Sequence, residues 1–89
     1  MEIKIKKDDY GHMKAVEDGL TLFEFEFRHD DDAWYFWMPG REYAPCVIPG
    51  KKFPMNYFLD ACRARHFTIF DTGIDEKVHV DGVKHTVVK

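Results

Sequence analysis

The stretch LTLFEFEFRHDDDAWYFWM, residues 20–38, decides how we expect this chain to fold. In its first part, Leu20–Arg28, aromatic residues alternate with charged ones, a pattern typical of a strand that buries one face. The polar segment His29–Asp32 follows, and Ala33–Met38 predicts a second strand. The stretch is therefore expected to form an antiparallel β-hairpin.

The length of the connecting loop predicts the register of this hairpin. If the loop contains four residues, His29–Asp32, then Arg28 pairs with Ala33. One face then carries the apolar pairs Phe27–Trp34, Phe25–Phe36 and Phe23–Met38, and the other carries the pairs Glu26–Tyr35 and Glu24–Trp37. A slip of one residue in either strand would mix the two faces, so the pattern favours this register over its neighbours.

The residues before the hairpin predict two more strands. Met1–Lys7 alternates apolar and charged residues, and Asp8–Gly11 is a turn cluster. The segment His12–Asp18 is compatible with either a helix or a strand. We favour a strand, because Asp18-Gly19 is a two-residue hairpin signal that leads into the Leu20–Arg28 strand.

The residues after the hairpin predict a loop and then a helix. Pro39–Lys52 is rich in proline and glycine, with a short strand expected at Cys46–Ile48. A helix is expected over Pro54–Arg65, because proline suits its first position and apolar residues follow at helical spacing. The apolar stripe contains Met55, Phe58, Leu59 and Cys62, the outer face contains Asn56, Asp60 and Arg63, and Arg65 and His66 lie near the C-terminal end.

The last part of the chain predicts further strands. Phe67–Asp71 is rich in β-forming residues, and Asp71–Gly73 predicts a turn. Val78–Val88 predicts a second hairpin around Asp81-Gly82, with the pairs Val80–Val83, Val78–His85 and Glu76–Val87 on one face. His85 then points into a face made mostly of valines, with His79 on the opposite face.

These elements predict a single domain that spans residues 1–89. The expected class is α+β, with a mainly antiparallel β-sheet of about five to six strands and one α-helix, residues 54–65, packed on one face. Aromatic residues make up 16% of the chain and supply large apolar areas for a small core.

Charge is mildly acidic overall and uneven along the chain. The net charge of −3 disfavours a protein that binds duplex nucleic acid through its phosphates. Acids dominate residues 17–32, and bases dominate residues 41–65. This asymmetry could steer a charged partner, or it could simply form two solvated faces.

Several features favour a cytoplasmic protein. Ile3 and Ile5 are interleaved with lysines rather than joined in a signal-peptide core, and no apolar run approaches the roughly 20 residues that span a membrane. Cys46 and Cys62 fit no zinc spacing and are expected to be free thiols of a reducing compartment.

No motif specifies an enzymatic chemistry, and we expect neither a cofactor nor a metal. The acids of His29–Asp32 lack the alternate spacing, glycine and distal glutamate of a calcium loop, so a solvated hairpin tip is favoured. The chain contains no serine, Cys62 lies on the apolar helix stripe, and no phosphate-binding glycine loop is present.

The hairpin face with the pairs Glu26–Tyr35 and Glu24–Trp37 is the strongest candidate for a functional surface. Exposed, it would combine two aromatic residues with a charged rim, the composition of a protein-binding hot spot; covered, its aromatics would belong to a second layer of core. The predicted binding residues are Tyr35, Trp37, Glu24, Glu26, Asp30 and Asp31.

The leading hypothesis is a non-enzymatic protein-binding module whose partner is another protein with a basic surface. A small inhibitor of the kind encoded by phages or mobile elements, directed at a nucleic-acid-handling host protein, fits this description. One alternative is a domain that binds single-stranded nucleic acid by stacking bases on Tyr35 and Trp37, with Lys51, Lys52, Arg63 and Arg65 nearby. Another is a structural homo-oligomer joined through sheet edges.

Overall fold

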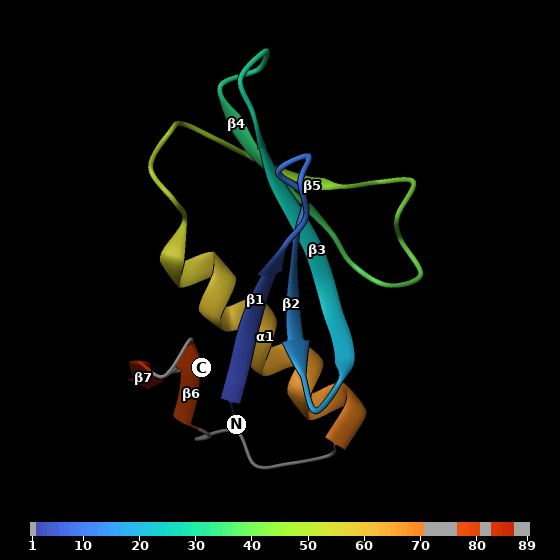
Figure 1. Ribbon diagram of the computed structural model, residues 1–89, viewed down its shortest axis with the longest axis vertical. Coiled ribbons are helices and arrows are strands. Elements are labelled where there is room, and N and C mark those ends of the chain that lie inside the picture. The colour runs from blue at the N-terminus through green and yellow to red at the C-terminus, as the bar shows by residue number, and fades with distance from the viewer. Residues whose placement is uncertain (1, 71–76, 81–82, 87–89) are drawn as a thin grey trace.

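The computed structural model has an α+β fold, as the sequence predicts, and it describes residues 2–70, 77–80 and 83–86. Side chains are described for residues 2–70 and for Val80. The elements in chain order are β1 (Glu2–Lys7), β2 (Met13–Glu17), β3 (Leu20–Arg28), β4 (Ala33–Trp37), β5 (Cys46–Pro49), α1 (Met55–Phe70), β6 (Lys77–Val80) and β7 (Val83–Thr86). Figure 1 shows α1 crossing behind the strands, with the tip of the β3–β4 hairpin at one end of the molecule.

Strands β1 to β5 form a five-stranded antiparallel sheet in which each strand pairs with the next along the chain. On the far side of β1 the sheet continues through a parallel pairing with β6, which is antiparallel to β7. The complete order is β5-β4-β3-β2-β1-β6-β7. Strand β5 therefore forms the edge of the sheet beside the central hairpin.

The register predicted for the central hairpin is confirmed. Arg28 pairs with Ala33, and the ladder runs through Phe27–Trp34, Glu26–Tyr35, Phe25–Phe36 and Glu24–Trp37. Strand β4 ends at Trp37, so the ladder does not include the predicted pair Phe23–Met38, although Met38 still packs against the core. The period of two along each strand therefore separates an apolar face from a polar one, as expected.

The segment before the hairpin is a strand, which resolves the ambiguity at residues 12–18. Asp18 and Gly19 both have positive φ, 51° and 78°, as a two-residue turn that matches the strand twist requires. The β2–β3 register shifts between Ala15 and Val16. Such a bulge turns consecutive residues inward, and Leu22 and Phe23 are both buried on β3.

Aromatic rings from the sheet and the helix meet in one core. The ring of Phe58 on α1 lies 5.6 Å from that of Phe23 and 5.3 Å from that of Phe25, measured between centroids. Phe36 stacks on Phe25 at 5.5 Å. The buried cluster contains Ile3, Ala15, Leu22, Phe23, Phe25, Phe36, Phe58, Leu59, Cys62 and Val80.

Helix α1 is longer than the sequence predicts. It continues to Phe70, so the strand predicted from residue 67 is wrong over residues 67–70, and two strands rather than three are seen after the helix in the described residues. Nothing between Arg65 and Phe70 stops a helix, since the segment has no glycine or proline. A short apolar run without such a stop does not distinguish a strand from a helix.

The orientation of the helix also differs from the prediction. Arg63, placed on the outer face from the sequence, is buried at 7% exposure, and Met55 of the expected apolar stripe is 42% exposed. Arg65 lies within the helix rather than near its end, and its Nε donates a hydrogen bond to the Leu22 carbonyl at 3.2 Å. This contact joins Arg65 of the helix to the bulged part of β3.

The predicted register of the last hairpin is confirmed where the structure describes it, with Val80 opposite Val83 and Val78 opposite His85. The turn at residues 71–73 and the pair Glu76–Val87 lie outside the described residues. Among the described elements, α1 does not have the length and hydropathy of a membrane-crossing helix.

Candidate functional site

The candidate site lies on the sheet face that points away from α1. Phe36 faces the helix core, so its neighbours Tyr35 and Trp37 on β4 point to the opposite side. Both are half-buried. Their cross-strand partners Glu26 and Glu24 share that side. We call the surface formed by Glu24, Glu26, Arg28, Tyr35 and Trp37 the open face.

The two aromatic rings of the open face are stacked and capped by an arginine. The ring centroids of Tyr35 and Trp37 lie 5.8 Å apart, with 26° between their planes. The guanidinium carbon of Arg28 lies 4.3 Å from the Tyr35 centroid and 5.4 Å from the Trp37 centroid. A guanidinium at this distance is attracted by the negative ring faces.

Glu26 connects this arginine to a histidine from another part of the sheet. Its Oε2 lies 3.5 Å from Arg28 Nε, and its Oε1 lies 3.1 Å from His12 Nε2. His12 comes from the turn between β1 and β2, where Asp8 lies 3.6 Å from its Nδ1. Glu26 is the least exposed of these groups, at 18% of its side chain, so its position is held from both sides.

The turn that carries His12 is itself held by Asp8. Desolvation acts to raise the pKa of the Asp8 carboxyl, but hydrogen bonds from the backbone amides of His12 and Tyr10 outweigh it and lower that pKa. Oδ1 of Asp8 accepts these bonds at 2.9 Å and 2.8 Å. The carboxylate therefore stays ionised next to His12 and fixes the loop that presents it.

The hairpin tip joins the open face through Asp31. The Tyr35 hydroxyl donates a hydrogen bond to Asp31 Oδ2. This bond to a carboxylate, followed by desolvation, raises the pKa of Tyr35, so the phenol remains a donor at neutral pH. Asp30 is exposed at the same tip. Five of the six predicted binding residues, Asp31, Tyr35, Trp37, Glu24 and Glu26, therefore adjoin the open face, and Asp30 lies at the tip of the same hairpin.

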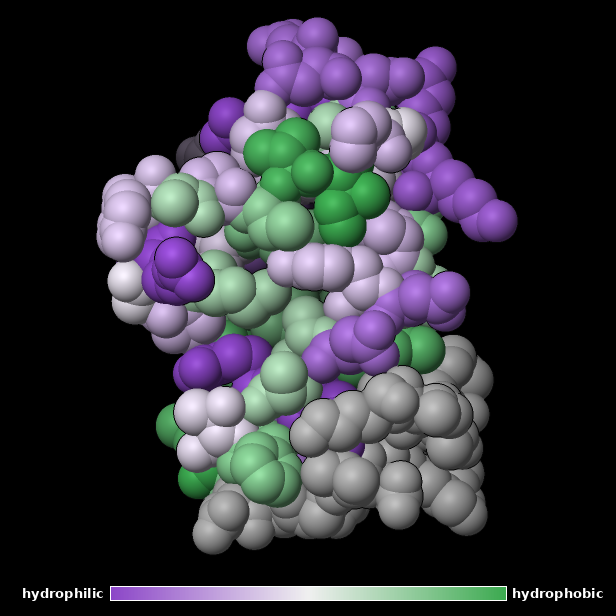
Figure 2. Space-filling model, turned by 180° about the vertical axis from the view of Figure 1, so that it is seen from behind, coloured by the Kyte–Doolittle hydropathy of each residue, from purple (hydrophilic) through white to green (hydrophobic). Residues whose placement is uncertain are grey.

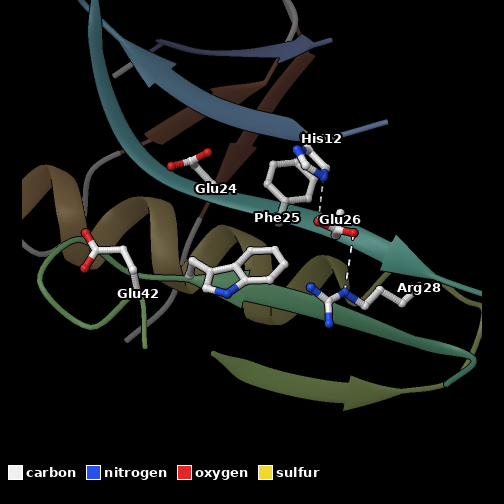
Figure 3. A pocket seen from close by; sticks show the side chains of 7 residues that line it. His12, Glu24, Phe25, Glu26, Arg28 and Glu42 are labelled. Carbon is white, nitrogen blue, oxygen red and sulfur yellow. Dashed lines mark hydrogen bonds and ion pairs between the residues drawn. The ribbon is translucent and has the colours of Figure 1, made fainter. Parts of the chain in front are cut away.

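A pocket of about 390 Å³ opens in this face. Its lining contains His12, Glu24, Phe25, Glu26, Arg28, Trp37 and Glu42. Figure 3 shows Glu26 joined by dashed lines to His12 and Arg28, while Glu24 and Glu42 lie toward the other end of the pocket. Three carboxylates therefore surround a cavity in which Arg28 is the one arginine.

Glu42 and His12 are site residues that sequence reasoning missed. Glu42 lies in the loop after β4, where its own backbone amide and that of Gly40 donate hydrogen bonds to the carboxylate and lower its pKa. The Gly40 amide lies 3.0 Å from Glu42 Oε1. Both residues reach the pocket from turns, and no periodic pattern of the sequence marks them.

Two of the four cations expected near Tyr35 for nucleic-acid binding, Arg63 and Arg65, are placed elsewhere. Arg63 is buried, and Arg65 bonds the Leu22 carbonyl on the helix side. Lys14 does share the open side, directly opposite Glu24. A phosphate backbone laid along Tyr35 and Trp37 would meet Arg28 together with the carboxylates of Glu24 and Glu26.

A second cluster, on the helix side, combines a thiol, an imidazole and a carboxylate. His66 Nδ1 lies 2.7 Å from Glu17 Oε1, and both residues are buried. Burial, followed by the charge of Glu17, raises the pKa of the nearby Cys62 thiol well above its usual range. Cys62 is 0% exposed, so this arrangement does not offer a thiolate to a substrate. Within residues 2–70, 77–80 and 83–86 no histidine, cysteine and carboxylate cluster fits a metal ion.

The two cysteines should react very differently with a thiol reagent. We expect the exposed Cys46 to react with DTNB in the native protein, and the buried Cys62 to react only on unfolding. Absorbance of the released thiolate should correspond to one equivalent without denaturant and two in guanidinium chloride. The variant Cys46→Ala should lose the native reaction. Fast native reaction of both thiols would contradict the burial of Cys62.

The side of the molecule toward α1 has a different character. Figure 2 shows that side, with hydrophobic side chains interspersed among hydrophilic ones below a hydrophilic end. Met55, Phe67 and Ile69 are the exposed large apolar residues of α1. The concentrated combination of aromatic rings, carboxylates and a pocket lies on the open face.

Comparison of the chain with protein-family models, with curated proteins and with solved structures gives no match in any of the three. What the open face does therefore has to be inferred from its own residues.

Proposed function

We propose that this protein is a non-enzymatic binding module that docks its open face on a basic surface of another protein. The observation that carries the proposal is the position of the stacked Tyr35–Trp37 pair next to a pocket bordered by carboxylates. Aromatic anchors with a charged rim are the composition that concentrates binding energy at protein interfaces.

The rigidity of this surface supports the same function. Both aromatic residues lie on β4, which is paired on both sides, and the side chains around them are linked to one another through Arg28, Glu26 and His12. Side chains that are already ordered lose less conformational entropy on binding. The face is therefore arranged for docking before a partner arrives.

The charge of the hairpin indicates the kind of partner. Glu24, Asp30 and Asp31 are exposed on the hairpin, and their charges favour the approach of a positively charged surface. Basic surfaces are typical of nucleic-acid-handling proteins. A small inhibitor that occupies such a surface, of the kind that phages and mobile elements encode, is the form of the proposal that these charges favour.

Charge reversal on the hairpin tests the proposal. We expect Glu24→Lys/Asp30→Lys to weaken binding of the partner about tenfold at low salt, because two attractive charges become repulsive. The variant Glu2→Lys/Asp60→Lys makes the same change of net charge at exposed sites off the open face and should bind like the wild type. Affinity capture from source cells with the three proteins, compared by mass spectrometry, identifies partners that depend on the hairpin.

The same three proteins separate the alternatives. A partner that is lost at low salt with the hairpin variant alone, with a difference from the wild type that shrinks as salt is added, supports docking through the open face. Equal capture by all three contradicts it. A dimer in light scattering that the hairpin variant abolishes would assign the face to self-association, and salt-sensitive quenching of tryptophan by oligonucleotides would assign it to nucleic acid.

A further inference from the structure

Arg28 shows which chemical group the open face accepts. Its guanidinium carbon lies 4.3 Å from the Tyr35 ring centroid and 5.4 Å from that of Trp37, and its Nε lies 3.5 Å from a Glu26 oxygen. The face thus combines two π surfaces with a carboxylate around one guanidinium. This is the environment in which an arginine is held most specifically, by stacking and ion pairing together.

The pocket beside Arg28 also combines an aromatic side chain with carboxylates, and it has free volume for a ligand group. Trp37 contributes to its wall, and the carboxylates of Glu24 and Glu42 border it away from Arg28. Its volume of about 390 Å³ falls within the range of roughly 300–1,000 Å³ typical of ligand pockets. It is therefore large enough for a side chain, and its charge is complementary to a cation.

The carboxylates are not equally engaged. Glu26 is shared between Arg28 and His12. Glu24 is exposed and paired along the ladder with Trp37 and Lys14. Hydrogen bonds from backbone amides lower the pKa of Glu42 and hold its carboxylate ionised. In the pocket lining, three carboxylates therefore face one arginine and one histidine.

We propose that this pocket receives an arginine side chain of the partner protein, with its guanidinium against Trp37 and between the carboxylates of Glu24 and Glu42. The proposal rests on the proposed function and names the partner group that the open face recognises. Arginine is favoured over lysine because its planar guanidinium stacks on an indole and forms two parallel hydrogen bonds with a carboxylate. Arg28 competes for the same aromatic faces.

A peptide titration followed by NMR tests this directly. The probes are three capped peptides, Gly-Arg-Gly, Gly-Lys-Gly and Gly-citrulline-Gly. Citrulline has nearly the shape of arginine but is neutral. The readout is the indole N–H signal of Trp37, assigned with Trp37→Phe. The indole of Trp34 donates to the Lys51 carbonyl at 3.1 Å and serves as the internal reference.

We expect the arginine peptide to shift the Trp37 signal and to bind about tenfold more tightly than the citrulline peptide and about threefold more tightly than the lysine peptide. Glu24→Gln/Glu42→Gln should weaken the arginine peptide about fivefold, and Glu2→Gln/Asp60→Asn should leave it unchanged. Arg28→Ala should strengthen it about threefold, because the competing guanidinium is gone.

The proposal is overturned if arginine and citrulline peptides bind equally, or if the pocket variant binds the arginine peptide as well as the wild type does. Its failure is distinguishable from that of the proposed function. If capture of a partner depends on Glu24 and Asp30 but peptide binding is unaffected by Glu24→Gln/Glu42→Gln, the docking function is supported and the arginine site is contradicted. Specific peptide binding without hairpin-dependent capture would remove the docking function.

Discussion

Replacing Phe25 with alanine is expected to lower the free energy of unfolding by about 3–5 kcal/mol. The ring of Phe25 contacts those of Phe23, Trp34, Phe36, Phe53 and Phe58, with centroids 5.3 to 6.5 Å away. Alanine would leave a cavity that these rings cannot close without losing their contacts with one another. Domains of this size have a total stability of about 5–15 kcal/mol, so the loss is a large part of the whole.

Urea unfolding followed by tryptophan fluorescence measures this effect. Phe25→Leu keeps most of the buried volume and should cost clearly less than Phe25→Ala. Tyr43→Ala is the matched control, because Tyr43 is aromatic but 84% exposed, and we expect a change within about 0.5 kcal/mol. If Phe25→Ala changed stability no more than Tyr43→Ala does, Phe25 would not be the centre of the core.

Replacing Glu17 with alanine is expected to cost about 3 kcal/mol, because it breaks a buried pair. Oε1 of Glu17 lies 2.7 Å from Nδ1 of His66, and both side chains are at most 9% exposed. The change leaves the imidazole buried without this partner. Its desolvation is then no longer offset by a hydrogen bond, which lowers the free energy of unfolding. His66→Ala should cost a similar amount for the converse reason.

A double-mutant cycle separates the pair from simple loss of volume. If Glu17 and His66 interact as the geometry indicates, Glu17→Ala/His66→Ala should cost at least about 1 kcal/mol less than the sum of the single losses. Replacing both by apolar residues, Glu17→Met/His66→Leu, should recover most of the stability. Strictly additive single losses would show that the two side chains do not depend on each other.

Glu17 lies on the helix side of the sheet and is not part of the open-face pocket. Phe25 belongs to the core but also lines that pocket, so Phe25→Ala is expected to disturb the pocket as well as the core. Variants on the open face, such as Glu24→Lys, change an exposed residue and should leave the unfolding free energy nearly unchanged. Stability and binding can therefore be altered separately in this small domain.

The central hairpin and its two faces could be predicted from the sequence because their signal is local. Alternation of aromatic and charged residues over Leu20–Arg28 and Ala33–Met38 leaves one register in which both faces stay uniform, and the ladder from Arg28–Ala33 to Glu24–Trp37 confirms it. The turn at Asp18-Gly19 was predictable for the same reason, since it requires two residues that tolerate positive φ.

The end of α1 and the orientation of its side chains could not be predicted in this way. Phe67–Phe70 has the composition of a strand, yet it continues the helix. Arg63 is a charged residue of the kind expected on the outer face of a helix, yet it is buried. Both depend on how the helix lies against the bulged strand β3, where Arg65 bonds the Leu22 carbonyl, and that contact joins residues 43 positions apart.

The pocket shows the same division between local and long-range information. The sequence by itself determined that Tyr35, Trp37, Glu24 and Glu26 share one face, because side chains alternate along paired strands. Only the tertiary structure brought His12 and Glu42 to that face from two separate turns, and placed Glu17 next to His66 across 49 positions. Periodicity is set by neighbouring residues, whereas the meeting of distant turns and the burial of polar pairs depend on how the whole sheet packs on the helix.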